Sequence, residues 1–289
     1  ENGVLRLLTA FFFRKAGERN DENAFEFTHK SFGEYLVARR VVRLLGDMQE
    51  ELLRHEKTYR GWTPQQCMEE WARLCGPTAM NQRQWDFLKN EMHQPTARPH
   101  DWQPLLVKLI NALLRQGMPM EKLGLPDFMK MQFQARNAEE ALLLALSATA
   151  QVTQQLSEIS WPKITSFAVW LKGLQGQSGG GDEVLVRLAL AWMNLEGLHL
   201  WMADLNGCDL WKANLANTHI SLANLTEANL TEANLAGANL GGARLEEVNL
   251  NEAYLGNARL SGAFLYGADL TGADLTGADL TGADLTGAD

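Results

Sequence analysis

A five-residue period in the C-terminal third of the chain restricts the fold more than any other feature. From Leu195 to Leu285 every fifth residue is leucine, with isoleucine at Ile220 as the exception. Residues five apart on an α-helix lie about 140° apart around the axis, so these leucines would share no helical face. On a flat strand, successive leucines would point to opposite faces. What remains is a chain that turns a corner every five residues.

The neighbours of the leucines indicate how such a coil packs. From Ala203 onward a small residue, most often alanine, stands two positions before almost every leucine, as Ala223 stands before Leu225. In extended geometry both side chains point inward, and the Asn or Asp between them points outward. The remaining pair, such as Thr271-Gly272, forms the corner, where glycine tolerates unusual dihedral angles. We expect the inward leucines to form the structural core: Leu205, Leu215, Leu225, Leu235, Leu245, Leu255 and Leu265.

The repeated A(D/N)LxX pattern resembles the pentapeptide-repeat family over residues 193–289. The resemblance implies a right-handed quadrilateral β-helix with four pentapeptides per coil, in which residues 20 apart stack. His199 and His219 would then lie one above the other on an outer face, and Trp201 and Trp211 on opposite sides. We expect these four residues to be candidates for a binding surface, because exposed tryptophans are costly unless something covers them. Two histidines without a nearby carboxylate are a poor metal site, so ordinary solvated surface is the alternative for them and no metal is predicted.

Helical signals dominate residues 46–174, for which we predict a helical-hairpin domain. Thr63 followed by Pro64 is typical of an N-cap and first turn, and Asn81 is a further N-cap candidate. A helix from Leu105 ends near Gly117. Two more helices are predicted, one opened by a capping box of Asn137 and Glu140 and a short one over Trp161 to Leu171.

Two short segments connect this domain to the repeats. The sequence QGQSGGG over residues 175–181 predicts a flexible linker. Residues 182–192 place an Asp at a plausible N-cap before mostly apolar residues, which predicts a helix that caps the open end of the coil. The predicted fold is therefore an all-helical N-terminal region followed by the β-solenoid.

The stretch FEFTHKSFGEYLVARR over residues 25–40 contains a histidine, a serine and a glutamate. Ser31 and Glu34 fit the S-x-x-E capping box, which predicts a helix start rather than a catalytic pair. A hydrolase would need a nucleophile, a base and an orienting group, and no G-x-S-x-G motif is present. We therefore predict no catalytic residue and no enzyme activity for this chain. The buried face of the helix is expected to comprise Phe32, Leu36, Val37, Val41, Leu44 and Leu45.

The same stretch is similar to the F-x-H-x-S-F-x-E-(Y/F)-(L/F)-A-A signature that closes the winged-helix region of NACHT-type STAND ATPases, the NLR-like branch. The resemblance implies that residues 1–45 are the end of such a region and that His29 senses the β-phosphate of bound ADP. A hydrogen bond from His29 to backbone near the helix start is the alternative. No G-x-x-x-x-G-K-(S/T) loop is present. ADP or ATP with magnesium is therefore expected only with an ATPase core upstream of Glu1, and no cofactor within this chain.

Charge, cysteine content and hydropathy limit which partners and which compartment we expect for this chain. Residues 191–289 hold 13 acidic and 3 basic residues, a net charge of −10, whereas residues 1–190 have a net charge of +1. An acidic repeat repels nucleic acid, so direct nucleic-acid binding is not expected. Three cysteines without metal-ligand spacing indicate free thiols in a reducing compartment, which favours the cytoplasm. The longest apolar run, Ala141 to Ala150, is too short to span a membrane.

Three functional hypotheses follow. The favoured one is the C-terminal regulatory part of a bacterial NACHT-type ATPase, in which the solenoid recognises a ligand or protein. The family resemblance implies oligomerisation on activation and a role in defence signalling such as defence against phage. The alternative is an acidic DNA mimic that binds gyrase or another DNA-binding protein. The third is a rigid spacer. The ligand, the effector, and whether the near-identical terminal GADLT copies are natural or engineered stay open.

Overall fold

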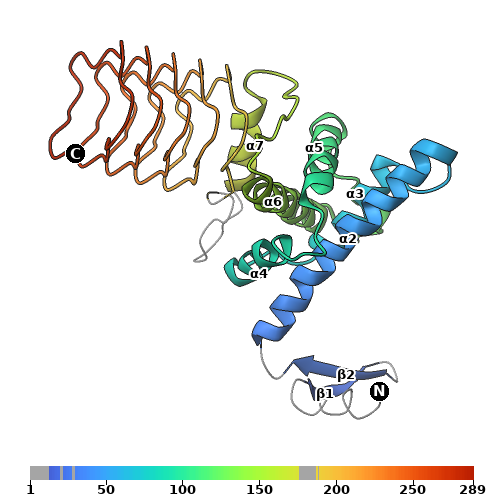
Figure 1. Ribbon diagram of the computed structural model, residues 1–289. Helices are drawn as coiled ribbons and strands as arrows, with labels where there is room; N and C mark the ends of the chain where they lie inside the picture. The colour runs from blue at the N-terminus through green and yellow to red at the C-terminus, as the bar shows by residue number, and fades with distance from the viewer. Residues whose placement is uncertain (1–12, 20–21, 28–29, 176–186, 188) are drawn as a thin grey trace.

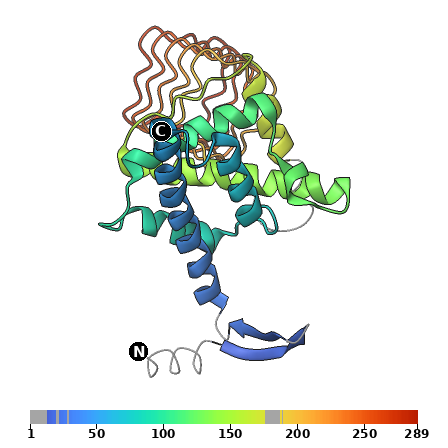
Figure 2. The same ribbon diagram turned by 90° about the vertical axis from the view of Figure 1, so that its right-hand side faces the viewer.

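The structure is a computed structural model in which a helical domain adjoins a four-sided coil, with a β-hairpin at the opposite end (Figure 1). A turned view shows the coils stacked behind the helices (Figure 2). The residues that the structure describes are 13–19, 22–27, 30–175, 187 and 189–289.

The hairpin consists of β1 (Phe13–Arg19) and β2 (Glu22–Phe27), which pair antiparallel with Phe13 opposite Phe27. The pairing is irregular between Lys15 and Gly17. The prediction of an all-helical N-terminal region is therefore wrong for this segment. Polar and apolar residues alternate at the end of β2, a pattern with the period of a strand. His29, to which a nucleotide-sensing role was assigned by resemblance, lies outside the described residues.

The helical domain is built around one buried helix. α6 contacts α3, α4, α5 and α7, and every residue from Ala141 to Ala150 is buried. The apolar run is thus the centre of the domain. No helix in the described ranges is long and apolar enough to cross a membrane. The helices are α2 (Lys30–Thr58), α3 (Pro64–Cys75), α4 (Gln82–Met92), α5 (Pro99–Gln116), the 3₁₀ helix η1 (Met120–Leu123), α6 (Phe128–Thr153) and α7 (Ser166–Gln175).

Two predicted helix starts are confirmed. The backbone N–H of Gln66 donates to Thr63 Oγ1 at 3.3 Å, and Thr63 N–H donates to Gln66 Oε1 at 2.9 Å. Asn81 and Gln84 form the same reciprocal pair at the start of α4, with both distances 2.9 Å. These capping boxes satisfy backbone donors that the first helical turn leaves without partners. The predicted end of α5 at Gly117 is also confirmed.

The predicted capping box of Ser31 and Glu34 is wrong. α2 begins at Lys30, so Ser31 lies inside its first turn and Glu34 lies just beyond that turn. Glu34 is buried, and its Oε1 accepts a hydrogen bond from Asn81 Nδ2 at 3.0 Å. Arg83 Nη1 donates to Ser31 Oγ at 3.4 Å and lies 3.9 Å from Glu34 Oε2. These polar residues therefore connect α2 to the start of α4.

The predicted buried face of α2 is confirmed only in its later part, because Phe32 and Leu36 are half-buried. Val41, Leu44 and Leu45 are buried, but Val37 is 40% exposed and Ala38 is buried instead. The stripe of side chains facing the core is therefore centred one residue later than expected.

Asn137 does not open a helix, so that prediction is wrong as well. α6 starts at Phe128, with Asp127 as its N-cap. Asn137 lies in the middle of α6, and its Nδ2 donates to the carbonyl of Gly76 at 2.8 Å. The residue joins α6 to the end of α3. The short helix expected at Trp161 begins later, at Ser166.

The repeats form four-sided coils with four pentapeptides in each. Parallel bridges join residues 20 apart, as in the series Asn214, Asn234, Tyr254 and Asp274. The bridges are single residues rather than longer strands, because the chain turns after each one. The corner accepts residues other than glycine in the left-handed region, including Leu222 with φ of 58°.

Candidate interaction surfaces

The first coil is hydrogen-bonded to the helical domain through its backbone. The N–H of Asn194 donates to the carbonyl of Ser157 at 3.2 Å, and Ser157 N–H donates to Trp192 O at 2.8 Å. On the next side, His199 N–H donates to Ile164 O at 2.9 Å. Residues of the helical domain thus occupy the positions that a preceding coil would take.

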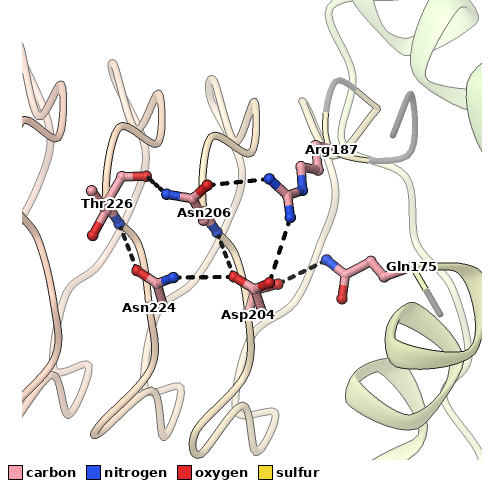
Figure 3. Close-up of polar contacts among 6 residues, drawn as sticks. All are labelled: Gln175, Arg187, Asp204, Asn206, Asn224 and Thr226. Carbon is pink, nitrogen blue, oxygen red and sulfur yellow. Dashed lines mark hydrogen bonds and ion pairs between the residues drawn. The ribbon is translucent and has the colours of Figure 1, made fainter. Parts of the chain in front are cut away.

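The remaining two sides are joined through Gln175 and Arg187, and Figure 3 shows the polar cluster on the side of Asp204. Gln175 Nε2 donates to the backbone carbonyl of Asp204 at 2.8 Å, and Asp209 N–H donates to Arg187 O at 2.6 Å. The Arg187 guanidinium lies 3.5 Å from Asp204 Oδ2 and donates to Asn206 Oδ1 at 3.1 Å (Figure 3). All four sides of the first coil are therefore connected to residues that precede it.

The predicted capping helix over 182–192 falls largely outside the described residues. Its described end, Ala189 to Trp192, is not helical. Ala189 and Leu190 are nevertheless fully buried, and one apolar cluster runs without a break from α7 into the leucines of the coils. The coil entrance is thus covered by the helical domain itself. The predicted linker also lies outside the described residues, except for Gln175 at the end of α7.

The inward leucines stack in columns at 20-residue spacing, so leucines ten residues apart lie on opposite sides of the coil core. Each of the seven leucines from Leu205 to Leu265 at ten-residue spacing is at most 1% exposed. The leucine N–H groups donate to the following coil, as Leu225 does to Arg244 O at 2.7 Å. The side chains of the coil core are buried, and the backbone is paired from coil to coil.

Trp201 lies in an exposed apolar patch at one corner of the first two coils. It is 58% exposed, and its neighbours Met202 and Leu222 are 60% and 54% exposed. Met202 and Leu222 are 20 residues apart and occupy the same corner position in successive coils. We call these three residues the corner patch. Adjacent exposed apolar side chains are typical of surfaces that bind other proteins.

Trp211 is partly covered by a residue that the sequence analysis did not single out. Its ring centroid lies 5.8 Å from that of Trp192, with the planes at 78°. Lys212 Nζ lies 5.2 Å from the Trp192 ring and 5.1 Å from the Trp211 ring, and forms an ion pair with Glu232 at 3.0 Å. Trp211 Nε1 also donates to Glu232 Oε1 at 3.4 Å. Trp192 stands 20 residues before Lys212, so the coil period could have predicted this cluster.

A shallow groove of about 560 Å³ runs from this cluster along one side of the coils. It combines aromatic, amide and charged groups, which suits a ligand with both apolar and hydrogen-bonding parts. Its walls include Leu156, Trp192, Lys212, Asn234, Tyr254 and Asp274.

The two histidines stack as the coil period predicts, with ring centroids 5.3 Å apart and planes at 32°. His219 Nε2 lies 2.9 Å from Ser221 Oγ, and Asn239 Nδ2 lies 3.4 Å from His219 Nδ1. The ring of His219 thus has polar partners within the coils. Among the described residues, no group of three His, Cys, Asp or Glu side chains is placed to hold a metal.

The three cysteines are free and buried. Burial raises the pKa of Cys67 and of Cys208 to about 12, and it also raises the pKa of Cys75. The thiols are therefore protonated at neutral pH and act as small apolar residues.

A four-sided coil of stacked five-residue repeats, connected to a helical domain, defines the class of protein. Residues 212–246, 223–262 and 249–287 match the family described as pentapeptide repeats, with eight copies. The C-terminal part of the chain therefore belongs to the pentapeptide-repeat family. The comparison with curated proteins returned no match.

Solved pentapeptide-repeat structures resemble this part of the chain. Rfr23 from the cyanobacterium Cyanothece 51142 is 39% identical over 34% of this chain and 57% of its own, with a TM-score of 0.23. The protein alr5209 from Nostoc PCC 7120 is 45% identical over 26% of this chain and 62% of its own, with a TM-score of 0.26. A thylakoid-lumen protein from Arabidopsis thaliana is 30% identical over 38% of this chain and 72% of its own, with a TM-score of 0.28. The chain thus spans about three fifths of the length of the first two.

Proposed function

We propose that this chain is a non-catalytic regulatory module in which the solenoid recognises a protein ligand and the helical domain responds. The observation that supports this most strongly is the junction. Backbone hydrogen bonds to Ser157, Ile164 and Arg187, together with the Gln175 side chain, join all four sides of the first coil to preceding residues. A joint of this kind transmits a displacement of the coils to the helices, whereas a flexible linker would absorb it.

The recognition surface in this proposal comprises the corner patch and the groove beside Trp211. Tryptophan and tyrosine are enriched at the centres of protein interfaces. Trp201 supplies an exposed aromatic ring, and Tyr254 in the groove is 57% exposed. The ligand is a protein segment with apolar side chains and free hydrogen-bonding groups.

The larger protein in this proposal is a cytoplasmic NACHT-type ATPase whose nucleotide-binding core precedes this chain. The motif over residues 25–40 supports it, together with the order of a β-hairpin followed by the long helix α2. His29 would sense ADP, and oligomerisation would follow activation, as the resemblance implies. Sequencing the coding region upstream of Glu1 tests this part, and a reading frame without a phosphate-binding loop would reject it.

The recognition role is tested by replacing both Trp201 and Trp211 with serine in the full-length protein. We expect signalling to be lost while the far-ultraviolet circular dichroism spectrum is unchanged. Phe128→Ser is the control, because Phe128 is 68% exposed and belongs to α6. Retention of signalling in the double variant would identify the coils as a spacer.

One observation favours a second function, mimicry of DNA. The net charge of −10 over residues 191–289 includes Asp274, Asp279 and Asp284, which are exposed on three sides of the last coils. Acidic surfaces of this kind attract proteins that bind DNA. Stoichiometric addition of the chain to a gyrase supercoiling assay tests this alternative, and undiminished supercoiling would remove it.

A further inference from the structure

We propose that a pocket between α5, α6 and α7 binds a small phosphorylated molecule with an apolar part. The pocket has a volume of about 610 Å³ and is lined by the end of α5, the middle of α6 and the start of α7. It lies in the helical domain and shares no lining residue with the corner patch or the groove. The inference does not depend on the function proposed above.

Three basic side chains from different elements line the pocket. Arg115 is in the last turn of α5, Arg136 is on α6, and Lys163 precedes α7. Glu139 is the one carboxylate among the described residues that line it. The local formal charge is therefore +2, in a chain whose net charge is −9. Anions are favoured here against the charge of the whole molecule.

The single carboxylate is already engaged. Glu139 Oε2 lies 2.5 Å from Arg136 Nη1 and accepts a hydrogen bond from Trp170 Nε1 at 3.0 Å. No carboxylate of the described residues forms an ion pair with Arg115 or Lys163. Both cations are thus available to an anionic ligand.

The third cation is held in place by α7. The guanidinium of Arg136 packs so closely on Gly173 that a Cβ at that glycine would lie 3.3 Å from Arg136 Cζ. Packing on one side and the Glu139 ion pair on the other fix the position of this guanidinium. A cation fixed in this way loses little entropy when an anion binds.

The start of α7 adds a partial positive charge to the same place. α7 is ten residues long and begins at Ser166, which lines the pocket with Thr165 and Lys163. The N–H of Ser166 already donates to the carbonyl of Lys163 at 2.9 Å, so the contribution of this helix end is its dipole, which is positive there and favours anions. Together with the three cations, it favours a doubly charged phosphate group over a singly charged carboxylate.

The remaining lining is apolar and indicates what the phosphate is attached to. Leu113, Leu114, Pro162 and Val169 line the pocket, and Val169 is 70% exposed. An exposed valine beside these cations would be covered by an apolar or aromatic group of the ligand, which favours binding. The ligand class is therefore an organic phosphate rather than inorganic phosphate alone.

Isothermal titration calorimetry with inorganic phosphate and with phenyl phosphate tests the inference. We expect both probes to bind, with phenyl phosphate the tighter of the two. The Arg115→Glu, Lys163→Glu double variant should weaken both by about tenfold or more, since charge-assisted hydrogen bonds to phosphate are lost. The matched control is Lys122→Glu with Lys172→Glu, because both lysines are exposed and neither lines the pocket.

A third variant separates the apolar contact from the charges. Val169→Ser should weaken phenyl phosphate and leave inorganic phosphate unchanged. Absence of saturable binding of either probe at millimolar concentration would overturn the inference, and so would an equal loss in the control pair. An equal effect of Val169→Ser on both probes would reject the apolar part. Unfolding midpoints of all variants within about 2 °C of the unmodified protein show that lost binding is not lost folding.

Discussion

At the scale of single residues, Leu222 and Leu225 are three positions apart and lie in opposite environments. Leu225 is fully buried, whereas Leu222 is 54% exposed in the corner patch. Leu225→Ala should lower the free energy of unfolding by about 2–5 kcal/mol, because it leaves a cavity in the coil core. Leu222→Ala should change it by about 0.5 kcal/mol or less. Urea unfolding followed by circular dichroism compares the two, and equal effects would contradict the inward register.

The hydrogen bonds of Asp279 predict how its contribution to stability depends on pH. Its Oδ1 accepts hydrogen bonds from the hydroxyl and the N–H of Thr281 at 2.6 and 3.0 Å, and Oδ2 accepts one from Ser261 at 2.7 Å. These hydrogen bonds lower the pKa of Asp279 to about 2, and the bond from the Thr281 hydroxyl has the largest effect. Because the folded pKa is depressed, the stabilisation is present above the ordinary pKa near 4 and is lost as the pH falls through about 2.

The measurement is an NMR titration of the Asp279 carboxyl group. Thr281→Val should move its pKa upward toward the ordinary value, since the largest cause of the shift is removed. Thr286→Val serves as the control, because it changes the equivalent hydrogen bond of Asp284 and leaves Asp279 untouched. A carboxyl group of the unmodified protein that titrates near 4 would show that the hydrogen bonds do not form.

The buried thiols predict slow chemical modification. Cys67 and Cys208 have a pKa of about 12 and are fully buried, so little thiolate is present at neutral pH. We expect an aromatic disulfide reagent to react with them only after unfolding. Reaction of the native protein within seconds would contradict the burial of these residues.

Local sequence patterns located some side chains of the candidate surfaces and missed others. The outward position of Trp201 follows from its place after a leucine. The partial burial of Trp211 does not follow from its local sequence, because the residue that contacts it is Trp192, which lies before the first full coil. Trp192 stands 20 residues before Lys212, which lies over its ring. Such contacts become visible only when the coil period is extended backward beyond the regular repeats.

At the scale of elements, Asn137 joins two helices through one buried hydrogen bond. Its Nδ2 donates to the carbonyl of Gly76 at the end of α3. Asn137→Ala should lower the free energy of unfolding by about 1–3 kcal/mol, since that buried carbonyl loses its donor. Asn90→Ala on α4 is the matched control, because Asn90 is exposed. A loss no greater than that of the control would mean that water replaces the asparagine.

The helix starts show why some elements could be predicted and others could not. Thr63 and Asn81 cap helices through partners three residues away, so the local sequence contains all of the information. Ser31 and Asn137 fit the same local motif, yet their side chains bind residues of other helices. A capping motif therefore predicts a helix start only where no earlier residue starts the helix. In α6 the earlier residue Asp127 is the N-cap, so the motif at Asn137 lies inside the helix.

At the scale of the whole molecule, the coil was predictable and its attachment was not. A strict period of five specifies corners and an inward leucine without reference to any distant residue. The junction instead pairs Ser157 and Ile164 with the first coil, and these residues are separated from it by the whole connecting segment. No local pattern marks them, because any backbone group can supply such a hydrogen bond.

The same period predicts which deletions the solenoid tolerates. Removing residues 250–269 takes out one whole coil, so Asn249 is followed by Leu270 and every later side chain keeps its side. Each coil contacts only its neighbours, so the unfolding midpoint should fall by only about a few degrees. Removing residues 250–252 deletes fewer atoms but shifts the later leucines out of the inward position. We expect this smaller deletion to lower the midpoint more, as measured by thermal unfolding with circular dichroism. Equal losses, or a greater loss for the whole coil, would show that the stability of the repeats does not depend on the twenty-residue stacking of their sides.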